Sequence, residues 1–266
     1  ASYPSAALGP YFVALDQGQQ AGVLYLATGE GLETVDISSP GEPTMLGRAV
    51  LPIDGADVAL DGHVAYLALA DQGLLAVDIR DPAKPEALGR YAAAAPGRVS
   101  AMAVDRRSGA SVHAYAYQVV IQALDRATRV LVGEPGLSIV DVTDPTQPAD
   151  VAFLPLEIDL GDAAIYFRSD VAISGTVAFV TGWQSGLHVV DVADPARPAL
   201  LATHRTPGSV QGVFTAGSTL YLAERPAWDA QQQKSVGGGL RALDISDPAR
   251  PREVGHAPAA YEALDV

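Results

Sequence analysis

The sequence predicts an all-β fold in which one four-stranded antiparallel sheet is repeated along the chain. Three observations lead to this prediction: a fifteen-residue segment recurs five times, each copy is rich in β-branched residues, and each copy runs into a proline-rich turn. Self-similarity with a period of about 40 to 50 residues is typical of the blades of a β-propeller. Glycine and proline interrupt the chain too often for long helices.

The recurring segment contains one aspartate at the same place in every copy. The segments are GEGLETVDISSPGEP, DQGLLAVDIRDPAKP, EPGLSIVDVTDPTQP, QSGLHVVDVADPARP and GGGLRALDISDPARP. Their shared aspartates are Asp36, Asp78, Asp141, Asp191 and Asp244. An aspartate that every copy keeps before a rigid turn indicates a structural role in that turn.

Each copy accounts for two strands, and the residues upstream of it account for two more. The two prolines that end a copy fix φ and remove backbone donors, so they end a strand. In the second copy, residues 56–60 and 64–69 flank a turn at Asp61-Gly62 and alternate as strands do. Four short strands per copy make a propeller blade, which must bury both faces against neighbouring blades.

The predicted blades divide the chain as follows. Residues 1–10 form an N-terminal extension and residues 11–266 a single propeller domain, with blade cores near 11–50, 51–91, 97–155, 165–205 and 208–260. Blade three carries about twenty extra residues between Ala101 and Gly133, which we expect to form an extended hairpin. After blade five, Leu264-Asp265-Val266 matches Ala56-Asp57-Val58 as the beginning of another inner strand. We predict a closed five-bladed ring; the alternative is part of a six- or seven-bladed propeller.

The repeat also resembles a known family. The pattern GL-x-[VI]-[VI]-D-[VI]-[ST]-D-P-x-x-P, preceded by A-x-D-V-A-[VL]-x-G-x-x-A-Y-[LV]-A, is similar to the LVIVD repeat from about Tyr11 to Val266. This resemblance implies a propeller fold, a place in secreted or cell-surface proteins of bacteria and archaea, and no assigned catalytic activity. Blade one departs from the pattern, because Ser39 stands where other blades have the aspartate of Asp-Pro.

Composition narrows the range of partners. The net charge of −14 opposes binding to phosphate backbones and to anionic lipids, so we expect no nucleic-acid partner. No stretch approaches the roughly 20 apolar residues of a membrane span, so we expect no membrane insertion. Cysteine is absent and the five histidines show no metal-binding spacing, so we expect no cofactor and no metal.

Acidic residues that precede the inner strands are the candidates for catalysis. The three carboxylates are Asp57, Asp170 and Glu262, each at the entry to an inner strand. Two of them flanking a glycosidic bond would be the acid and base of a glycoside hydrolase. The competing interpretation is that these aspartates belong to the repeat and accept backbone hydrogen bonds. Repetition favours the structural role, because catalysis needs asymmetry.

Candidates for binding lie at the same strand entries and in segments that break the repeat. They are Arg98, Arg126, Arg168, Gln211, Trp183 and Trp228. An exposed tryptophan in a loop often contacts a partner. We therefore predict a non-catalytic, extracytoplasmic propeller that binds or scaffolds other proteins, within a larger assembly. The alternative is a carbohydrate-active hydrolase or lyase, and a glycan is the second option for a ligand.

Overall fold

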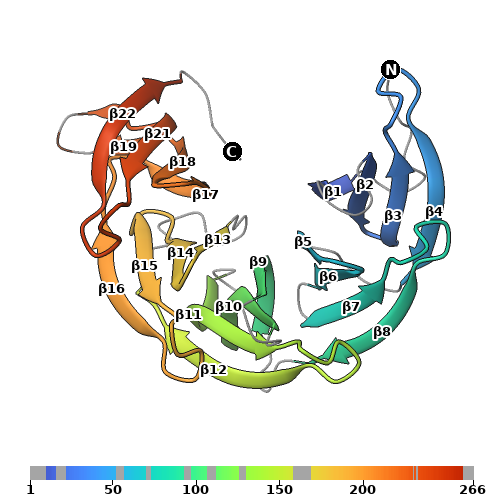
Figure 1. Cartoon of the computed structure of the whole chain (residues 1–266). Coiled ribbons are helices and arrows are strands. Elements are labelled where there is room, and N and C mark those ends of the chain that lie inside the picture. Colours follow the sequence, from blue (N-terminus) through green and yellow to red (C-terminus); the bar gives the residue numbers. More distant parts are fainter. Residues whose placement is uncertain are drawn as a thin grey trace. The chain divides into compact units, whose positions relative to one another are not determined.

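The structure is a computed structural model of the 266-residue chain. It describes residues 10–15, 22–51, 57–69, 73–92, 97–106, 112–125, 130–157, 169–229, 231 and 233–259. The regular elements of these residues are strands, which form five four-stranded sheets and one two-stranded sheet (Figure 1). The predicted all-β propeller architecture with five repeats is therefore confirmed.

The first two blades each use four consecutive strands of the chain. Blade one contains β1 (Pro10–Leu15), β2 (Val23–Thr28), β3 (Gly31–Asp36) and β4 (Thr44–Val50). Blade two contains β5 (Asp57–Asp61), β6 (Val64–Ala68), β7 (Leu74–Asp78) and β8 (Glu86–Tyr91). Every neighbouring pair in both blades is antiparallel, as the tight turns between successive strands require.

Blade three contains the longest strands. It consists of β9 (Gly97–Arg106), β10 (Val112–Asp125), β11 (Val130–Asp141) and β12 (Ala149–Pro155), in the order β12-β11-β10-β9. The extra residues of this blade extend β10 to 14 residues and β11 to 12 residues. The predicted extended hairpin is thus confirmed.

Blades four and five return to short strands, with one addition. Blade four contains β13 (Val171–Ser174), β14 (Val177–Thr181), β15 (Leu187–Asp191) and β16 (Ala199–His204). Blade five contains β17 (Ser209–Ala216), β18 (Thr219–Arg225), β21 (Gly239–Asp244) and β22 (Arg252–Pro258). Between β18 and β21 the chain forms a separate hairpin from β19 (Ala227–Asp229) and β20 (Lys234–Val236).

The shared aspartate of each repeat forms a turn, as predicted. In every blade its Oδ1 atom accepts a hydrogen bond at 2.8–3.0 Å from the backbone N–H two residues later. In blade five the hydrogen bonds from Ser246 hold the pKa of Asp244 below its usual value. The carboxylate therefore stays ionised and keeps the turn closed at neutral pH.

Close backbone contacts set the positions of the turns of blades two and three against the preceding blade. A Cβ on Gly47 of β4 would lie 2.5 Å from the carbonyl oxygens of Pro82 and Ala83 in the turn of blade two. A Cβ on Gly89 of β8 would meet Pro145 and Thr146 of blade three in the same way. Only glycine fits at these crossings, because any side chain would push the turn away from the strand.

Apolar residues between blades form the core. Tyr66, Leu74 and Ala76 of blade two pack with Met102, Val140 and Val142 of blade three. Phe179, Leu187 and Val189 of blade four pack with Leu220, Leu222 and Leu243 of blade five. The second and third strands of blade two thus send alternate side chains to blades one and three, which explains the scarcity of charge in the repeat.

The chain divides into two compact units. Residues 1–116 and 140–150 form the first, and residues 117–139 and 151–266 form the second. Blades one and two lie in the first unit and blades four and five in the second. The predicted single domain and closed ring concern the placement of these units and stay predictions.

Candidate functional site

Asp57 and Asp170 occupy the same place at the entry of an inner strand, in blades two and four. Asp57 accepts a hydrogen bond from the Val58 N–H at 2.8 Å on Oδ1 and one from the Met102 N–H at 2.7 Å on Oδ2. Asp170 does the same with the N–H groups of Val171 at 2.8 Å and Val213 at 2.9 Å. Met102 and Val213 belong to the next blade, so each carboxylate joins two inner strands.

This arrangement supports the structural role of the two aspartates. A carboxylate that accepts backbone N–H groups on both oxygens is stabilised as an anion. Its oxygens are then engaged in structural hydrogen bonds rather than available to accept a proton from a substrate. Asp57 lies in the first unit and Asp170 in the second, and Glu262 lies outside the described residues. We call the two bridging carboxylates the interblade clamps.

Two of the predicted binding residues, Trp183 and Gln211, lie at adjoining parts of blades four and five. Trp183 sits in the turn between β14 and β15, and its backbone pairs with Val210, the neighbour of Gln211. Trp183 is only 3% exposed, so it is a packed residue rather than the exposed loop tryptophan that a partner would contact. The reason is that its turn folds back onto β17 with a positive φ of 54°.

The remaining candidates have no described side chain. Arg98 lies in β9 and Trp228 in β19, where the backbone of Trp228 pairs with that of Ser235. Arg126 and Arg168 lie outside the described residues.

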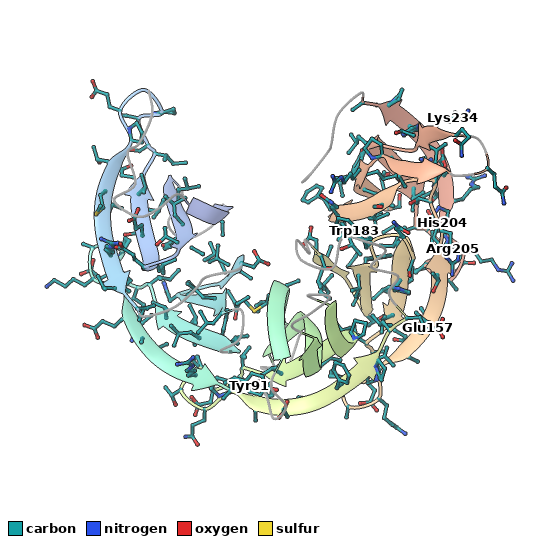
Figure 2. The ribbon with its side chains drawn as sticks, turned by 180° about the vertical axis from the view of Figure 1, so that it is seen from behind. Tyr91, Glu157, Trp183, His204, Arg205 and Lys234 are labelled. Atoms are coloured by element: carbon teal, nitrogen blue, oxygen red, sulfur yellow. The ribbon has the colours of Figure 1, made fainter. Side chains whose placement is uncertain are left out.

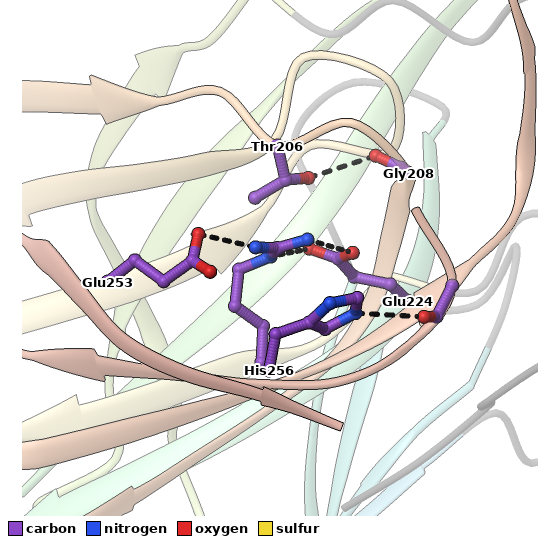
Figure 3. Close-up of polar contacts among 7 residues, drawn as sticks. Thr206, Gly208, Glu224, Glu253 and His256 are labelled. Carbon is purple, nitrogen blue, oxygen red and sulfur yellow. Dashed lines mark hydrogen bonds and ion pairs between the residues drawn. The ribbon is translucent and has the colours of Figure 1, made fainter. Parts of the chain in front are cut away.

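Sequence reasoning missed a buried ionic cluster in blade five, formed by Glu224, Arg241 and Glu253 (Figure 3). Arg241 donates from Nε to Glu224 Oε1 at 2.6 Å and from Nη2 to Glu224 Oε2 at 3.0 Å, and its Nη1 pairs with Glu253. The side chain of Arg241 is 4% exposed and that of Glu224 is 0% exposed, whereas that of Glu253 is 46% exposed. We call these three residues the blade-five anchor.

Two connecting segments close over the anchor. The Thr206 hydroxyl donates to the Gly208 carbonyl at 2.9 Å, and His256 Nε2 hydrogen-bonds the Gly238 carbonyl at 3.0 Å (Figure 3). A Cβ on Gly208 would lie 2.9 Å from the Gly238 nitrogen and 3.2 Å from Glu224 Oε2. The link from β16 to β17 therefore packs directly on Glu224 and on the base of the β19–β20 hairpin.

The sequence of the repeat does contain an indication of the blade-five anchor. Arg241 follows the Gly-Leu of its copy, and the same position holds Glu33, Leu75, Ser138, His188 and Arg241 in the five blades. In blade two this position and that of Glu224 hold Leu75 and Leu69, as the strand registers show. A charge on the buried side of such a strand requires a buried partner, and Glu224 is the acidic residue that comes next to it.

His188 occupies the equivalent position in blade four and is 2% exposed. Its Nδ1 hydrogen-bonds Thr203 Oγ1 at 3.1 Å. Burial lowers the pKa of His188, the backbone of Glu157 partly offsets this, and the positive charge of Arg205 lowers it further. Burial and the positive charge of Arg241 also lower the pKa of the neighbouring His204 on β16 (Figure 2).

Unfolding is therefore expected to become easier as the pH falls through the histidine range. The folded protein keeps His188 neutral, while the unfolded chain takes up a proton near pH 6.5. The contribution of neutral His188 to the free energy of unfolding is therefore fully present above about pH 6.5. It is lost as the pH falls towards the lower pKa that His188 has in the folded protein. His188→Leu, which restores the residue type of blade two, should reduce this slope in urea unfolding measured between about pH 7.5 and 5. An unchanged slope would show that His188 does not titrate in this range.

The described residues hold no cluster of three or more histidine, cysteine or acidic side chains suited to a metal ion. They also hold no helix that could cross a lipid bilayer.

Comparison with known proteins places these features in a family. The LVIVD-repeat profile matches residues 22–50, 54–93, 130–152, 168–206 and 235–257, which together make up more than half of the chain. No curated protein matches the sequence.

Several solved structures share the fold at low sequence identity. A periplasmic gluconolactonase of Pseudomonas aeruginosa aligns with a TM-score of 0.64 and 14% identity over 94% of this chain and 72% of its own. A protein from Lactobacillus plantarum aligns with a TM-score of 0.54 and 13% identity over 98% of this chain and 88% of its own. A computationally designed protein aligns with a TM-score of 0.57 and 10% identity over 96% of this chain, which spans only 64% of the designed protein.

At these sequence identities the similar structures show only that the fold is shared. The family profile goes further, because each of its five matches falls on a different one of the five sheets and includes the shared aspartate turn. The chain belongs to the LVIVD-repeat family of β-propellers.

Proposed function

We propose that this propeller is a non-catalytic, extracytoplasmic module that binds another protein through the β19–β20 hairpin of blade five. The observation that carries the proposal is the combination of an inserted hairpin with a buried ionic anchor at its base. Three residues lie between the last paired residues of the equivalent strands in blade two, Leu69 and Gly73, and three in blade four, Gly182 and Gly186. In blade five residues 225–238 lie between the corresponding pair, Glu224 and Gly239. Such an insertion adds surface to a rigid scaffold without changing the blade beneath it.

The chemistry of the hairpin suits contact with a protein. Its two strands pair at Ala227 with Val236, at Trp228 with Ser235 and at Asp229 with Lys234. Gln231, Gln233, Lys234 and Ser235 are exposed. The segment therefore combines an aromatic residue with polar side chains, a composition typical of protein-binding loops.

The anchor gives this hairpin a fixed base. Glu224 and Arg241 lie next to the points where the insertion leaves β18 and rejoins β21, and both are buried. The link from β16 to β17 packs against the same place, because Gly208 lies close to the backbone of Gly238 and to the Glu224 carboxylate. A loop that is held at its base loses less conformational entropy on binding, so the anchor favours affinity.

The interblade clamps support a role without catalysis. Of the carboxylates considered for acid-base chemistry, Asp57 and Asp170 each use both oxygens to hold backbone N–H groups of two blades. The extracytoplasmic location rests on what the resemblance to the LVIVD repeat implies, and a periplasmic gluconolactonase of similar fold is consistent with it.

Replacing residues 225–238 by Ala-Asp-Gln, the link of blade two, should abolish partner binding and leave the propeller folded. The protein is purified from its native source under mild conditions, and its mass is measured by size-exclusion chromatography with light scattering. We expect the full chain to elute with a partner that mass spectrometry identifies and that crosslinks to the hairpin. The shortened variant should elute alone, with the far-ultraviolet circular dichroism of the full chain.

A matched control changes the opposite end of the same blade. Ser246→Ala alters the exposed turn between β21 and β22 and should leave the complex intact. Retention of the partner by the shortened variant, or its loss with Ser246→Ala alone, would assign binding to another surface.

A further inference from the structure

The outer strand of blade four, β16, exposes apolar side chains to solvent. It is the last strand in the sheet order β13-β14-β15-β16, and no strand of the described part of the chain pairs with its outer edge (Figure 1). Leu200 is 48% exposed and Leu201 is 42% exposed. Both β16 and the blade that follows it lie within the second compact unit, so the exposed edge is a feature of that unit.

Charged side chains mark the other outer strands, but β16 has none at neutral pH. Natural sheets place charges on edge strands to prevent pairing with another chain. In the other outer strands these charges are Arg48 in β4, Glu86 and Arg90 in β8, Asp150 in β12, and Arg252 and Glu253 in β22. The one titratable residue of β16 is His204, and burial together with the positive charge of Arg241 lowers its pKa. The edge of β16 is therefore left without this protection.

A change in the repeat explains the exposure of Leu201. In blades one and two the bulged residue of the outer strand, Leu46 or Leu88, is half-buried and precedes a glycine. The turn of the next blade packs on that glycine, where a Cβ would lie 2.4–2.5 Å from the backbone of the turn. Blade four has Ala202 after its bulged residue, Leu201. The turn of blade five therefore cannot pack equally close on β16, and Leu201 stays exposed.

The charges that flank β16 decide which partner it fits. Arg197 precedes the strand and Arg205 follows it, and both are exposed. Arg197 pairs with the exposed Asp194, a contact of little strength, and Arg205 has no ion pair within the described residues. In an antiparallel pairing of two copies centred on Leu201, Arg205 of each copy would face Arg197 of the other. Since each copy also carries a net charge of −14, a second copy is disfavoured and an acidic partner is favoured.

We propose that β16 binds an extended segment of another protein that is apolar in its centre and acidic at both ends. The segment adds a fifth strand to blade four through backbone hydrogen bonds. Its apolar side chains cover Leu200 and Leu201, and its acidic ends lie beside Arg197 and Arg205. These two arginines are eight residues apart, which corresponds to roughly 26 Å of extended chain. This surface is separate from the β19–β20 hairpin and does not depend on its proposed role.

A peptide of about nine residues tests this pairing, because backbone hydrogen bonds supply most of the affinity in strand addition. The peptide has a glutamate at each end, alternating valine and threonine between them, and a fluorescein label. Its binding to the full chain is measured by fluorescence anisotropy. We expect saturable binding that weakens as salt is added, and slower hydrogen exchange of the β16 amides in the complex. The same peptide with a lysine at each end should bind about tenfold more weakly.

Variants of β16 separate the apolar contribution from the charge contribution. Leu200→Gln/Leu201→Gln should weaken binding of the glutamate peptide about tenfold, because it removes apolar contact without adding a charge. Arg205→Gln should weaken binding about threefold and reduce its salt dependence. Met45→Gln is the matched control, since Met45 holds the same register position in β4, is 44% exposed, and should leave binding unchanged.

The proposal is overturned if the glutamate peptide shows no binding at concentrations up to about 1 mM, or if the two peptides bind equally well. It is also overturned if the leucine double variant binds the glutamate peptide as tightly as the parent chain. A dimer in light scattering that the leucine double variant loses would overturn it too, because a second copy would then occupy β16. None of these results bears on the β19–β20 hairpin, since every variant keeps it.

Discussion

Arg241→Leu is expected to lower the free energy of unfolding by about 3–5 kcal/mol, because it leaves the fully buried Glu224 carboxylate without a counter-charge. The bidentate pair at 2.6 and 3.0 Å places both groups away from water. Once its guanidinium partner is removed, the carboxylate is buried without a hydrogen-bond partner for its charge, and its lost hydration is no longer offset. Equilibrium unfolding in guanidinium chloride measures the loss.

The double variant Glu224→Leu/Arg241→Leu should recover most of this loss. It installs the two leucines that blade two carries at the same register positions, Leu69 and Leu75, which are 0% and 7% exposed there. Replacing a buried ion pair by well-packed apolar residues is often neutral or stabilising. Glu253, half exposed, can be hydrated when its partner is gone.

Arg252→Leu is the control for this pair. Arg252 is 76% exposed and meets Asp244 at 3.2 Å, so its loss should change stability by less than about 1 kcal/mol. A double variant as unstable as Arg241→Leu alone would mean that the anchor fixes the local geometry beyond balancing charge.

Asp170→Ala is expected to cost about 2–4 kcal/mol, since it deprives the N–H groups of Val171 and Val213 of an ionised acceptor. Asp170→Asn keeps one side-chain oxygen and should cost roughly half as much. Asp57→Ala should have a similar effect in the first unit, through Val58 and Met102. Chemical denaturation, followed by hydrogen exchange of the Val213 amide, checks both the size and the place of the effect.

A catalytic Asp170 would behave differently. Its alanine variant would keep the stability of the parent chain, and the Val213 amide would exchange no faster than before. That outcome would contradict the role as an interblade clamp and return attention to acid-base chemistry.

Much of the fold was accessible from the sequence because the repeat encodes it locally. Alternation predicted the strands, the Asp-Pro turns predicted where they end, and the extra residues of blade three predicted the long β10–β11 hairpin. The role of Asp36 and its equivalents followed from their recurrence, and their backbone hydrogen bonds confirm it.

The candidate site was less accessible, because its contacts join residues that are remote in the chain. Asp57 meets Met102 45 residues later, and Glu224 meets Arg241 across an insertion. The exposure of Trp183 was predicted wrongly for a related reason. Composition marks a tryptophan in a turn as a contact residue, but only the pairing of that turn with Val210 reveals its burial.

The interblade clamps also make the molecule mechanically uneven. In a repeat protein, cooperativity depends on the strength of each junction between neighbours. The junctions from blade two to three and from blade four to five have a clamp, whereas blade one has Phe12 at the clamp position. A denaturant is therefore expected to unfold the two blades that share a clamp together rather than one blade at a time.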